Sequence, residues 1–276
     1  MNTAPPVALT IAGSDSGGGA GLQADLRTFT TCGVHGCVAV TAVTVQDSRG
    51  VSEIVTIPPA TVADQVRAVV SDIGVAAVKT GMLATAEIIT AVAGVCAELD
   101  LGTAVPLVVD PVAASRHGDP LLTGDALDVL RARLLPRATL LTPNLDEVAL
   151  LVGLTVRSPA QQEQAARALH QLGPRWVLVK GGHLGAGSPC VDLLFDGHEF
   201  TAFPAARQAT PHTHGGGDTL AAAITSALAC GLGMVEAVGY GKRYIEQAIA
   251  HAYPLGAGDG PVSPFWRLRQ RNRDTA

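Results

Sequence analysis

The chain alternates short, continuous apolar runs with segments of helical periodicity over most of its 276 residues. Six runs rich in β-branched residues are typical of strands: 7–13, 37–46, 75–81, 106–112, 138–144 and 175–182. Four of them lack the alternation of apolar and polar residues that a half-exposed strand shows, so both of their faces are expected to be covered. The pattern therefore predicts a mainly parallel sheet with helices on both sides.

Two of the intervening segments carry clear signals for the start of a helix. In "PPATVADQVRAVVSDIG", Thr61 is expected to be the N-cap residue and Asp64 the third helical residue. Its apolar residues fall on one face: Val62, Val66, Val69, Val70 and Ile73. In "SPAQQEQAARALHQLG", Ser158 is the expected N-cap, Pro159 the first helical residue and Gly173 the stop.

The C-terminal third has a different organisation. Residues 191–203 are typical of a hairpin that turns at Asp196 and Gly197. No charged residue occurs in 219–235, but polar residues and two glycines interrupt it, which favours a buried helix, a turn and a second helix over a membrane span. We expect one domain over 1–266, followed by a polar tail over 267–276 that is disordered.

Composition narrows the class of protein. The net charge is −5 and the pI is about 5.9, so no basic surface indicates a nucleic acid or an anionic membrane as partner. The five cysteines form no CxxC pair and have no histidine at metal-ligand spacing, which is typical of reduced thiols in a cytoplasmic protein. The start "MNTAPPVALTIAGSD" lacks the basic segment of a signal peptide.

Polar residues stand where the predicted strands end. They include Asp15, Gln46, Lys79, Asp110, Asn144 and Lys180. Each alone is more typical of a turn or a cap, but the carboxyl ends of parallel strands share one edge of the sheet, where ligands bind. Together with "THGGGD" before an apolar helix, they predict a shared site that handles phosphate groups.

The stretch "THGGGDTLAAAI" predicts how such a site works. A helix that begins after bare glycines presents its N–H groups and its dipole to an anion. Asp218, at the start of this helix, is suited to take a proton from a hydroxyl group. Asp218 is also a good helix N-cap, and one residue can serve both purposes.

Several stretches resemble the ribokinase-like kinases in order and spacing, and within these the hydroxymethylpyrimidine/phosphomethylpyrimidine kinases of thiamine biosynthesis. They are "AGSDSGGGAGLQADLRTF", "TAVTVQDS", "VKTGML", "DPVAASRHGDPLL", "TPNLDEVALL", "VLVKGGH", "THGGGDTLAAAI" and "GKRYIEQAI". The resemblance implies a single three-layer α/β/α domain with a mostly parallel central sheet, and a homodimer. It implies that Mg-ATP phosphorylates 4-amino-5-hydroxymethyl-2-methylpyrimidine and then its monophosphate.

The resemblance also assigns residues to the pyrimidine. Gln46 and Asp25 would pair with the edges of the aminopyrimidine ring, since a glutamine amide offers both a donor and an acceptor. Gly13 would let the ring approach the backbone, and Met82 and Val112 would supply apolar contact. The alternatives are a capping side chain for Gln46, an ordinary acid in the first turn of a helix for Asp25 and a core residue for Met82.

For the nucleotide and the metal, the resemblance points to the other half of the sheet edge. Asp110 and Glu147 match the positions that organise Mg²⁺ through water. The positions matching nucleotide contacts are Asn144, Lys180, Gly182 and Lys242. An ordinary charge in the first turn of a helix is the alternative for Glu147, and a solvated surface lysine for Lys242.

The reacting groups would be Asp218 as general base, Lys180 as a point charge on the transferred phosphoryl group, and three glycines as the anion hole. These glycines are Gly215, Gly216 and Gly217. Where the pyrimidine kinases usually have Gly-Thr-Gly-Cys, this chain has "GGGD", which matches the sugar and pyridoxal kinases. Ala113, Asp259 and Ser263 also depart from the pyrimidine-kinase pattern.

Two other functions remain open at this point. A pyridoxal kinase would use the same chemistry on a similar ring with a hydroxymethyl group; Asp218 fits it, whereas Gln46 and "SDSGGGAGLQAD" favour the pyrimidine. A non-catalytic protein that senses a thiamine precursor would need no base, so Asp218 with Lys180 argues against it.

Overall fold

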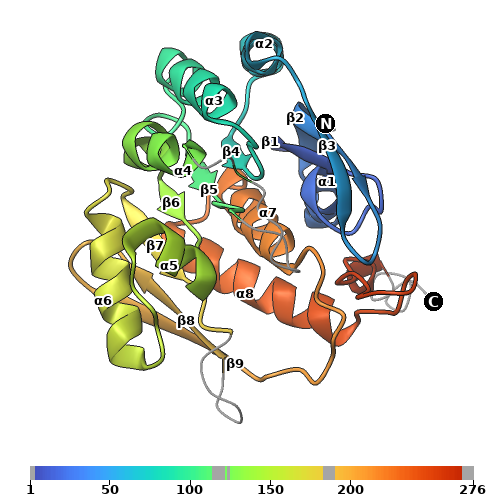
Figure 1. Ribbon diagram of the computed structural model, residues 1–276, viewed down its shortest axis with the longest axis vertical. Coiled ribbons are helices and arrows are strands. Elements are labelled where there is room, and N and C mark those ends of the chain that lie inside the picture. Colours follow the sequence, from blue (N-terminus) through green and yellow to red (C-terminus); the bar gives the residue numbers. More distant parts are fainter. Residues whose placement is uncertain (1–3, 114–121, 123–124, 183–189, 269–276) are drawn as a thin grey trace.

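A single twisted sheet forms the centre of the molecule in the computed structural model, which describes residues 4–113, 122, 125–182 and 190–268 (Figure 1). Within the described residues the sheet has nine strands in the order β3-β2-β1-β4-β5-β6-β7-β8-β9. Their bounds are β1 Val7–Asp15, β2 His35–Gln46, β3 Val51–Thr56, β4 Ala77–Thr80, β5 Leu107–Val109, β6 Leu140–Leu141, β7 Trp176–Val179, β8 Cys190–Phe195 and β9 Phe200–Ala205.

Neighbouring strands pair in parallel along the sheet from β2 through β1, β4, β5 and β6 to β7. The antiparallel strands, β3 at one edge and β8 and β9 at the other, complete the sheet. This confirms the predicted mainly parallel sheet and the hairpin of β8 and β9. Strand β3 was not predicted, because its segment "VSEIVT" is short, carries a charge and stays largely exposed. Pairing with β2 stabilises it.

Helices cover both faces of the sheet, as the continuous apolar strands predict (Figure 1). The bounds of the α-helices are α1 Gly21–Cys32, α2 Pro59–Asp72, α3 Ala86–Glu98, α4 Ala126–Val129, α5 Leu145–Val152, α6 Pro159–His170, α7 Gly216–Ala229 and α8 Met234–Ala250. A π-helix (Leu130–Leu134) and a 3₁₀ helix (Leu135–Arg137) follow α4. Helices α1, α7 and α8 pack on one face, and α2 to α6 on the other.

Alternation along each strand divides the core into two layers. In β5, Val108 packs with the α7 and α8 residues, whereas its neighbour Val109 packs with those of α3 and α5. Leu140 and Leu141 in β6 divide in the same way. The side chains divide in this way because successive residues of a strand point to opposite faces of the sheet. Both sets are buried.

Helix starts followed the sequence in one case and not in the other. Ser158 caps α6 by accepting the N–H of Gln161, as predicted. The prediction for α2 was wrong, since the helix begins at Pro59 with Pro58 as N-cap, and Thr61 lies inside the first turn. Proline is favoured at the first helical position because its missing N–H would be unpaired there in any case.

The uncharged segment forms the expected helix, turn and second helix, as α7, residues 230–233 and the start of α8. No helix of the described residues is long and apolar enough to cross a membrane. At the C-terminus, Arg267 contacts the hydroxyl oxygen of Tyr240 and the sulfur of Cys32. Residues 269–276 of the predicted tail lie outside the described residues.

Phe29 joins α1 to the sheet and to α7 and is fully buried. We expect Phe29→Ala to lower the free energy of unfolding by about 3–5 kcal/mol, because the ring's contacts are lost and a cavity remains. Ile73→Ala, at a side chain that is 51% exposed, is the control, with an expected change within about 0.5 kcal/mol. Urea unfolding measures both, and equal effects would contradict this account of the core.

Candidate active site

A cavity of about 690 Å³ opens at the carboxyl ends of the parallel strands. The chain passes from β1 to β2 on one side and on to β4 at the other side of β1, and such a switch point is where open α/β sheets bind ligands. Of the predicted site residues, the cavity is lined by Gly13, Gln46, Met82, Asp110, Val112, Asn144, Glu147, Lys180, Gly182, Gly215, Gly216, Gly217, Asp218 and Lys242. Asp25 is the one predicted site residue that does not line it.

The start of α7 lies against the glycine-rich loop that precedes α1. Gly215 has a left-handed φ of 72°, and a Cβ there would meet the carbonyl oxygen of Gly19 at 1.9 Å, so only glycine fits. The N–H of Gly216 donates to the Thr213 carbonyl. Among the described residues, no acceptor is bonded to the N–H of Gly215, Gly217 or Asp218. These three groups are available to an anion, whereas the N–H of Gly216 is not.

Asp218 is held from two sides. Lys79 Nζ donates to its Oδ1 at 3.0 Å, and the Gly21 N–H donates to its Oδ2 at 3.2 Å. The side chain is 13% exposed and faces the cavity. Burial raises the pKa of Asp218, but the Lys79 ammonium and these hydrogen bonds outweigh it and leave the pKa below its ordinary value. The carboxylate is therefore ionised and able to accept a proton.

Asp25 lies behind Asp218 and is fully buried. Its Oδ2 accepts hydrogen bonds from the Thr10 hydroxyl at 2.6 Å and from Lys79 Nζ at 3.0 Å. The predicted contact between Asp25 and the substrate ring is not formed by this arrangement, because α1 directs the side chain into the interior. The alternative of an ordinary acid in the first turn of the helix is wrong as well, because α1 begins at Gly21 and its first turn holds no acid.

A second charged group lies across the cavity. Lys180 Nζ is 3.1 Å from Asp110 Oδ1 and 4.0 Å from Glu147 Oε2. Burial and the neighbouring Asp110 raise the pKa of Glu147, and Lys180 opposes this rise. Burial lowers the pKa of Lys180, but the two carboxylates raise it above its ordinary value, so the ammonium stays charged. Gly217 adjoins this group, since a Cβ there would lie 3.4 Å from Lys180 Nζ.

Asn144 and Glu147 also have a local structural task. The Asn144 side chain accepts the Glu147 N–H, and the Glu147 carboxylate accepts the Asn144 N–H, each at 2.8 Å. This capping box fixes the start of α5 at the edge of the cavity. The alternative of a helix-start charge for Glu147 is thus correct in part, although the side chain is buried rather than solvated.

Lys242 reaches the cavity from α8. It is 8% exposed and pairs with Asp192 Oδ2 at 2.6 Å, while Asp192 Oδ1 accepts the N–H of Gly181. The alternative of a solvated lysine is excluded by this burial. The pair fixes the backbone that leads into Gly182.

The opposite end of the cavity is less charged. Met82 covers Gly13 so closely that a Cβ on Gly13 would lie 2.5 Å from the methyl carbon of Met82. Val112 has a positive φ of 41°, which is unusual for a β-branched residue and marks strain at the cavity wall. Gln46 lies at the end of β2 beside them. Gly13, Met82 and Val112 thus form a largely apolar wall against which a flat ring could pack.

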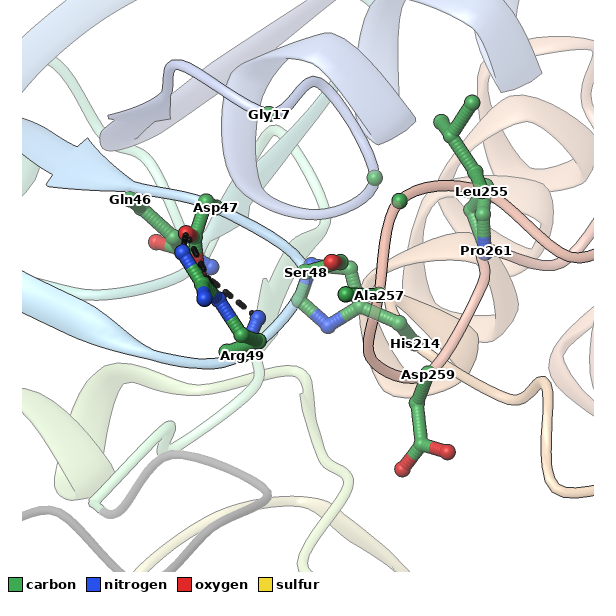
Figure 2. Close-up of a pocket in the computed structure, with 12 residues that line it drawn as sticks. Gly17, Gln46, Asp47, Ser48, Arg49, His214, Leu255, Ala257, Asp259 and Pro261 are labelled. Atoms are coloured by element: carbon green, nitrogen blue, oxygen red, sulfur yellow. Dashed lines mark hydrogen bonds and ion pairs between the residues drawn. The ribbon is translucent and has the colours of Figure 1, made fainter.

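Gln46 and His214 also line a neighbouring cavity of about 390 Å³, shown in Figure 2. Asp47, Ser48 and Arg49 from the turn after β2 form one side, and Leu255, Ala257, Asp259 and Pro261 from the C-terminal loop form another. His214 Nε2 lies 3.2 Å from Asp15 Oδ2. Asp259, where the sequence departs from the pyrimidine-kinase pattern, thus lines this neighbouring cavity. Most of the departing stretch "DPVAASRHGD" lies outside the described residues.

Four residues contribute to the site without having been assigned a role from the sequence: Asp15, Lys79, Asp192 and His214. Asp15 and Lys79 stand at strand ends, a signal that placed them near the site without defining their roles. Asp192 gives only a weak signal, a single acid within the apolar run "CVDLLF". His214 precedes the glycines and is separated from Asp15 by 199 positions, so only the fold reveals the pair.

No group of three or more metal-ligating side chains is formed among the described residues. The cavity nevertheless holds two buried carboxylates, Asp110 and Glu147, beside the start of α7. Such a donor set fits Mg²⁺, which keeps several waters and takes further oxygens from phosphate groups.

A carboxylate at a helix N-terminus, with a lysine and two further acids in the same cavity, fits a phosphotransferase that acts on small molecules, the class that the resemblance to the ribokinase-like kinases implies. Residues 15–263 match the phosphomethylpyrimidine kinase family. The chain belongs to this family, and the resemblance seen in its motifs is confirmed.

The relatives include pyrimidine and pyridoxal kinases. The chain is 58% identical over 264 residues to the hydroxymethylpyrimidine/phosphomethylpyrimidine kinase of Mycobacterium tuberculosis, covering 96% of this chain and 95% of the relative. A Bacillus subtilis pyridoxal kinase in complex with ADP has a TM-score of 0.87 at 36% identity, covering 96% and 99% of the two chains. A Staphylococcus aureus pyridoxal kinase in complex with AMP-PCP and pyridoxal has a TM-score of 0.84 at 35% identity, covering 95% and 94%.

Asp15 organises the glycine loop before α1. Its carboxylate accepts the N–H groups of Gly17, Gly19 and Ala20, and contacts His214. Burial raises the pKa of Asp15, but His214 and these N–H groups lower it more, so the pKa lies below its ordinary value. A lowered pKa stabilises the fold at pH values above the unfolded pKa of about 3.9, and this contribution is lost as pH falls through the folded pKa.

We expect Asp15→Asn to lower the free energy of unfolding by about 1–3 kcal/mol at neutral pH, because the amide NH₂ cannot accept a backbone N–H. The difference from the unsubstituted protein is expected to shrink as pH falls from the unfolded pKa of about 3.9 through the lower folded pKa, where Asp15 itself becomes protonated. Urea unfolding at neutral and acidic pH measures this, and a difference that grows on acidification would contradict the assignment.

Proposed function

We infer that the protein is an ATP-dependent kinase that phosphorylates 4-amino-5-hydroxymethyl-2-methylpyrimidine, and then its monophosphate, in thiamine biosynthesis. The observation that carries this function is the placement of Asp218 opposite Lys180 in one cavity, in a chain of the phosphomethylpyrimidine kinase family. The kinase function predicted from the sequence agrees with the 58% identity to the Mycobacterium tuberculosis enzyme.

The first transfer needs a base, because an alcohol is a poor nucleophile until its proton is removed. The oxygen of the substrate hydroxyl attacks the γ-phosphorus of ATP while Asp218 accepts the proton of that hydroxyl. ADP leaves with the electrons of the broken P–O bond. The N–H groups of Gly217 and Asp218 and the ammonium of Lys180 stabilise the negative charge on the transferred group.

The nucleotide is placed at the end of the cavity where Asn144, Lys180, Gly182 and Lys242 lie. The ADP and AMP-PCP complexes of the two pyridoxal kinases support nucleotide binding by this fold. Asp110 and Glu147 would hold Mg²⁺ through water, and the ion would neutralise charge on the phosphate oxygens.

We place the pyrimidine at the other end of the cavity, against the wall that Gly13, Met82 and Val112 form together. Gln46 would pair with the edge of the ring that carries the amino group. Asp25 takes no part in this contact, because its carboxylate is buried behind Asp218.

Pyridoxal kinase activity is the second candidate. Asp218 fits the motif of the pyridoxal kinases in the resemblance described above, and the structural similarity to two pyridoxal kinases is high. Their identity to this chain is 35–36%, against 58% for the pyrimidine kinase, and this difference favours the pyrimidine over pyridoxal as the proposed substrate. A sensor without activity has no use for the ionised Asp218.

Two further expectations concern the protein as a whole. We propose a homodimer, supported by three exposed valines on one face of the β2–β3 hairpin, Val43, Val45 and Val55. We place the protein in the cytoplasm, a reducing compartment that suits its five free cysteines. Light scattering of the purified protein measures the first, and cell fractionation the second.

The function is tested by incubating the protein with Mg-ATP and either the hydroxymethylpyrimidine or pyridoxal, followed by mass analysis of the products. We expect the pyrimidine mono- and diphosphate as main products, and a loss of both when EDTA removes the metal. Pyridoxal phosphate as the only product would move the protein to the second candidate function.

Replacing Asp218 separates the two phosphoryl transfers. The second nucleophile is a phosphate that already carries a charge of about −1.5 to −2, so it needs no base and is repelled by a carboxylate. We expect Asp218→Ala to lower kcat of the first transfer by about 10²–10⁴-fold and that of the second much less. Single-turnover assays with each purified acceptor measure the two rates, and equal losses would exclude Asp218 as the base.

A further inference from the structure

Behind the proposed base lies a buried charge cluster that the transfer reaction does not yet explain. Lys79 projects from β4 and is fully buried. Its ammonium donates to Asp25 Oδ2 on α1 and to Asp218 Oδ1 on α7, each at 3.0 Å. Three elements that are distant in sequence therefore meet in one carboxylate–ammonium–carboxylate arrangement.

This cluster is costly as a purely structural device. It contains two carboxylates and one ammonium, and Asp25 and Lys79 are both completely buried. Asp25 Oδ2 receives two hydrogen bonds, while its Oδ1 has no partner among the described residues. A buried acceptor without a partner and an unbalanced charge both lower stability, so apolar residues would serve the fold better.

The cluster has an evident effect on proton transfer. Asp218 paired alone with a buried ammonium would be a weak base, because the ion pair opposes protonation. Because Asp25 also binds the Lys79 ammonium, this ammonium stabilises the ionised form of Asp218 less than it would alone. When Asp218 takes up a proton, Lys79 still has Asp25 as its counter-ion, so no unpaired cation is left in the interior.

We propose that Asp25 and Lys79 are positioning residues for the first phosphoryl transfer: Asp25 shares the Lys79 ammonium with Asp218 and so sets the strength of Asp218 as a base. The inference rests on the proposed function. During the step, the proton passes from the substrate hydroxyl to Asp218, and the cluster changes from a net charge of −1 to zero while the Lys79–Asp25 pair persists.

Other charged groups face the cluster from the surrounding elements. Asp110 follows β5 and acts on Lys79. Lys180 follows β7 and pairs with Asp110 and with Glu147 on α5. His214 precedes α7, acts on Asp218, and contacts Asp15. None of these is hydrogen-bonded to Asp25 or Lys79 among the described residues, so the two residues form a distinct unit with Asp218.

Titration of Asp25 offers a way to observe this coupling. Burial raises the pKa of Asp25 to about 7, against the opposing effect of Lys79. Below that pH a protonated Asp25 no longer shares the ammonium, and Asp218 becomes a weaker base. The rate of the first transfer is therefore expected to rise as pH rises through about 7.

The test is Asp25→Asn, which keeps the shape of the side chain and fixes the uncharged state. We expect kcat of the first transfer to fall roughly three- to tenfold at pH 8, with unchanged KM for the pyrimidine and an unchanged rate of the second transfer. The rise of the first rate through neutral pH is expected to disappear. The second transfer, measured on the same preparation, corrects for any unfolded protein.

Thr80→Val is the matched control, because Thr80 is a fully buried neighbour on β4 whose hydroxyl has no partner among the described residues. It changes buried polarity without changing charge, and we expect an unaltered pH profile. The double variant Asp25→Asn with Lys79→Met removes both charges together. Without its cation, Asp218 is expected to have a higher pKa, so the first transfer of the double variant loses rate on acidification, which that of Asp25→Asn alone does not.

Three results would overturn the inference. An Asp25→Asn variant whose pH profile matches that of Thr80→Val would show that Asp25 does not act on the base. If Asp25→Asn lowered the rates of both transfers equally, Asp25 would have a structural role only. If it raised the KM for the pyrimidine in both transfers, Asp25 would contact the substrate directly. Failure of the proposed function has a different signature, in which Asp218→Ala leaves the first transfer intact or the unsubstituted protein forms no pyrimidine phosphate.

Discussion

The site depends on the compensation of buried charges along one edge of a parallel sheet. The strand ends and the helices packed against them bring Asp25, Lys79 and Asp218 together on one side, and Asp110, Glu147 and Lys180 on the other. Buried charges persist only when they are paired, so each cluster fixes its own geometry. The start of α7 lies between the two clusters, where a phosphoryl group passing from one side to the other would meet both.

In the proposed reaction, the two clusters would have different tasks. Lys180 and the acids beside it form the side that would receive the nucleotide and a metal ion, with Lys242 and Asp192 supporting the backbone there. Asp218 and the residues behind it form the side that would remove a proton. Gly215 and Gly19 allow the loop before α1 to approach the segment before α7 closely.

Much of the fold was predictable, because continuous apolar strands that alternate with amphipathic helices leave few other arrangements. The parallel core, the late hairpin and the start of α6 all followed from local pattern. Strand β3 was missed because it is an exposed edge, and the start of α2 was misplaced because Pro59 outweighs the capping potential of Thr61. The family also followed from motif order and spacing, and most of the predicted site residues line one cavity.

By itself the sequence determined which residues stand at the strand ends, because a polar group that interrupts an apolar run must lie where the strand leaves the core. It did not determine what each polar group contacts. Asp25 and Asp218 are separated along the chain by nearly two hundred residues, and only the packing of α1 and α7 against β4 places the Lys79 ammonium between them. The direction of a buried side chain is decided by the elements packed around it, and that is why a residue expected at the substrate ring lies instead behind the base.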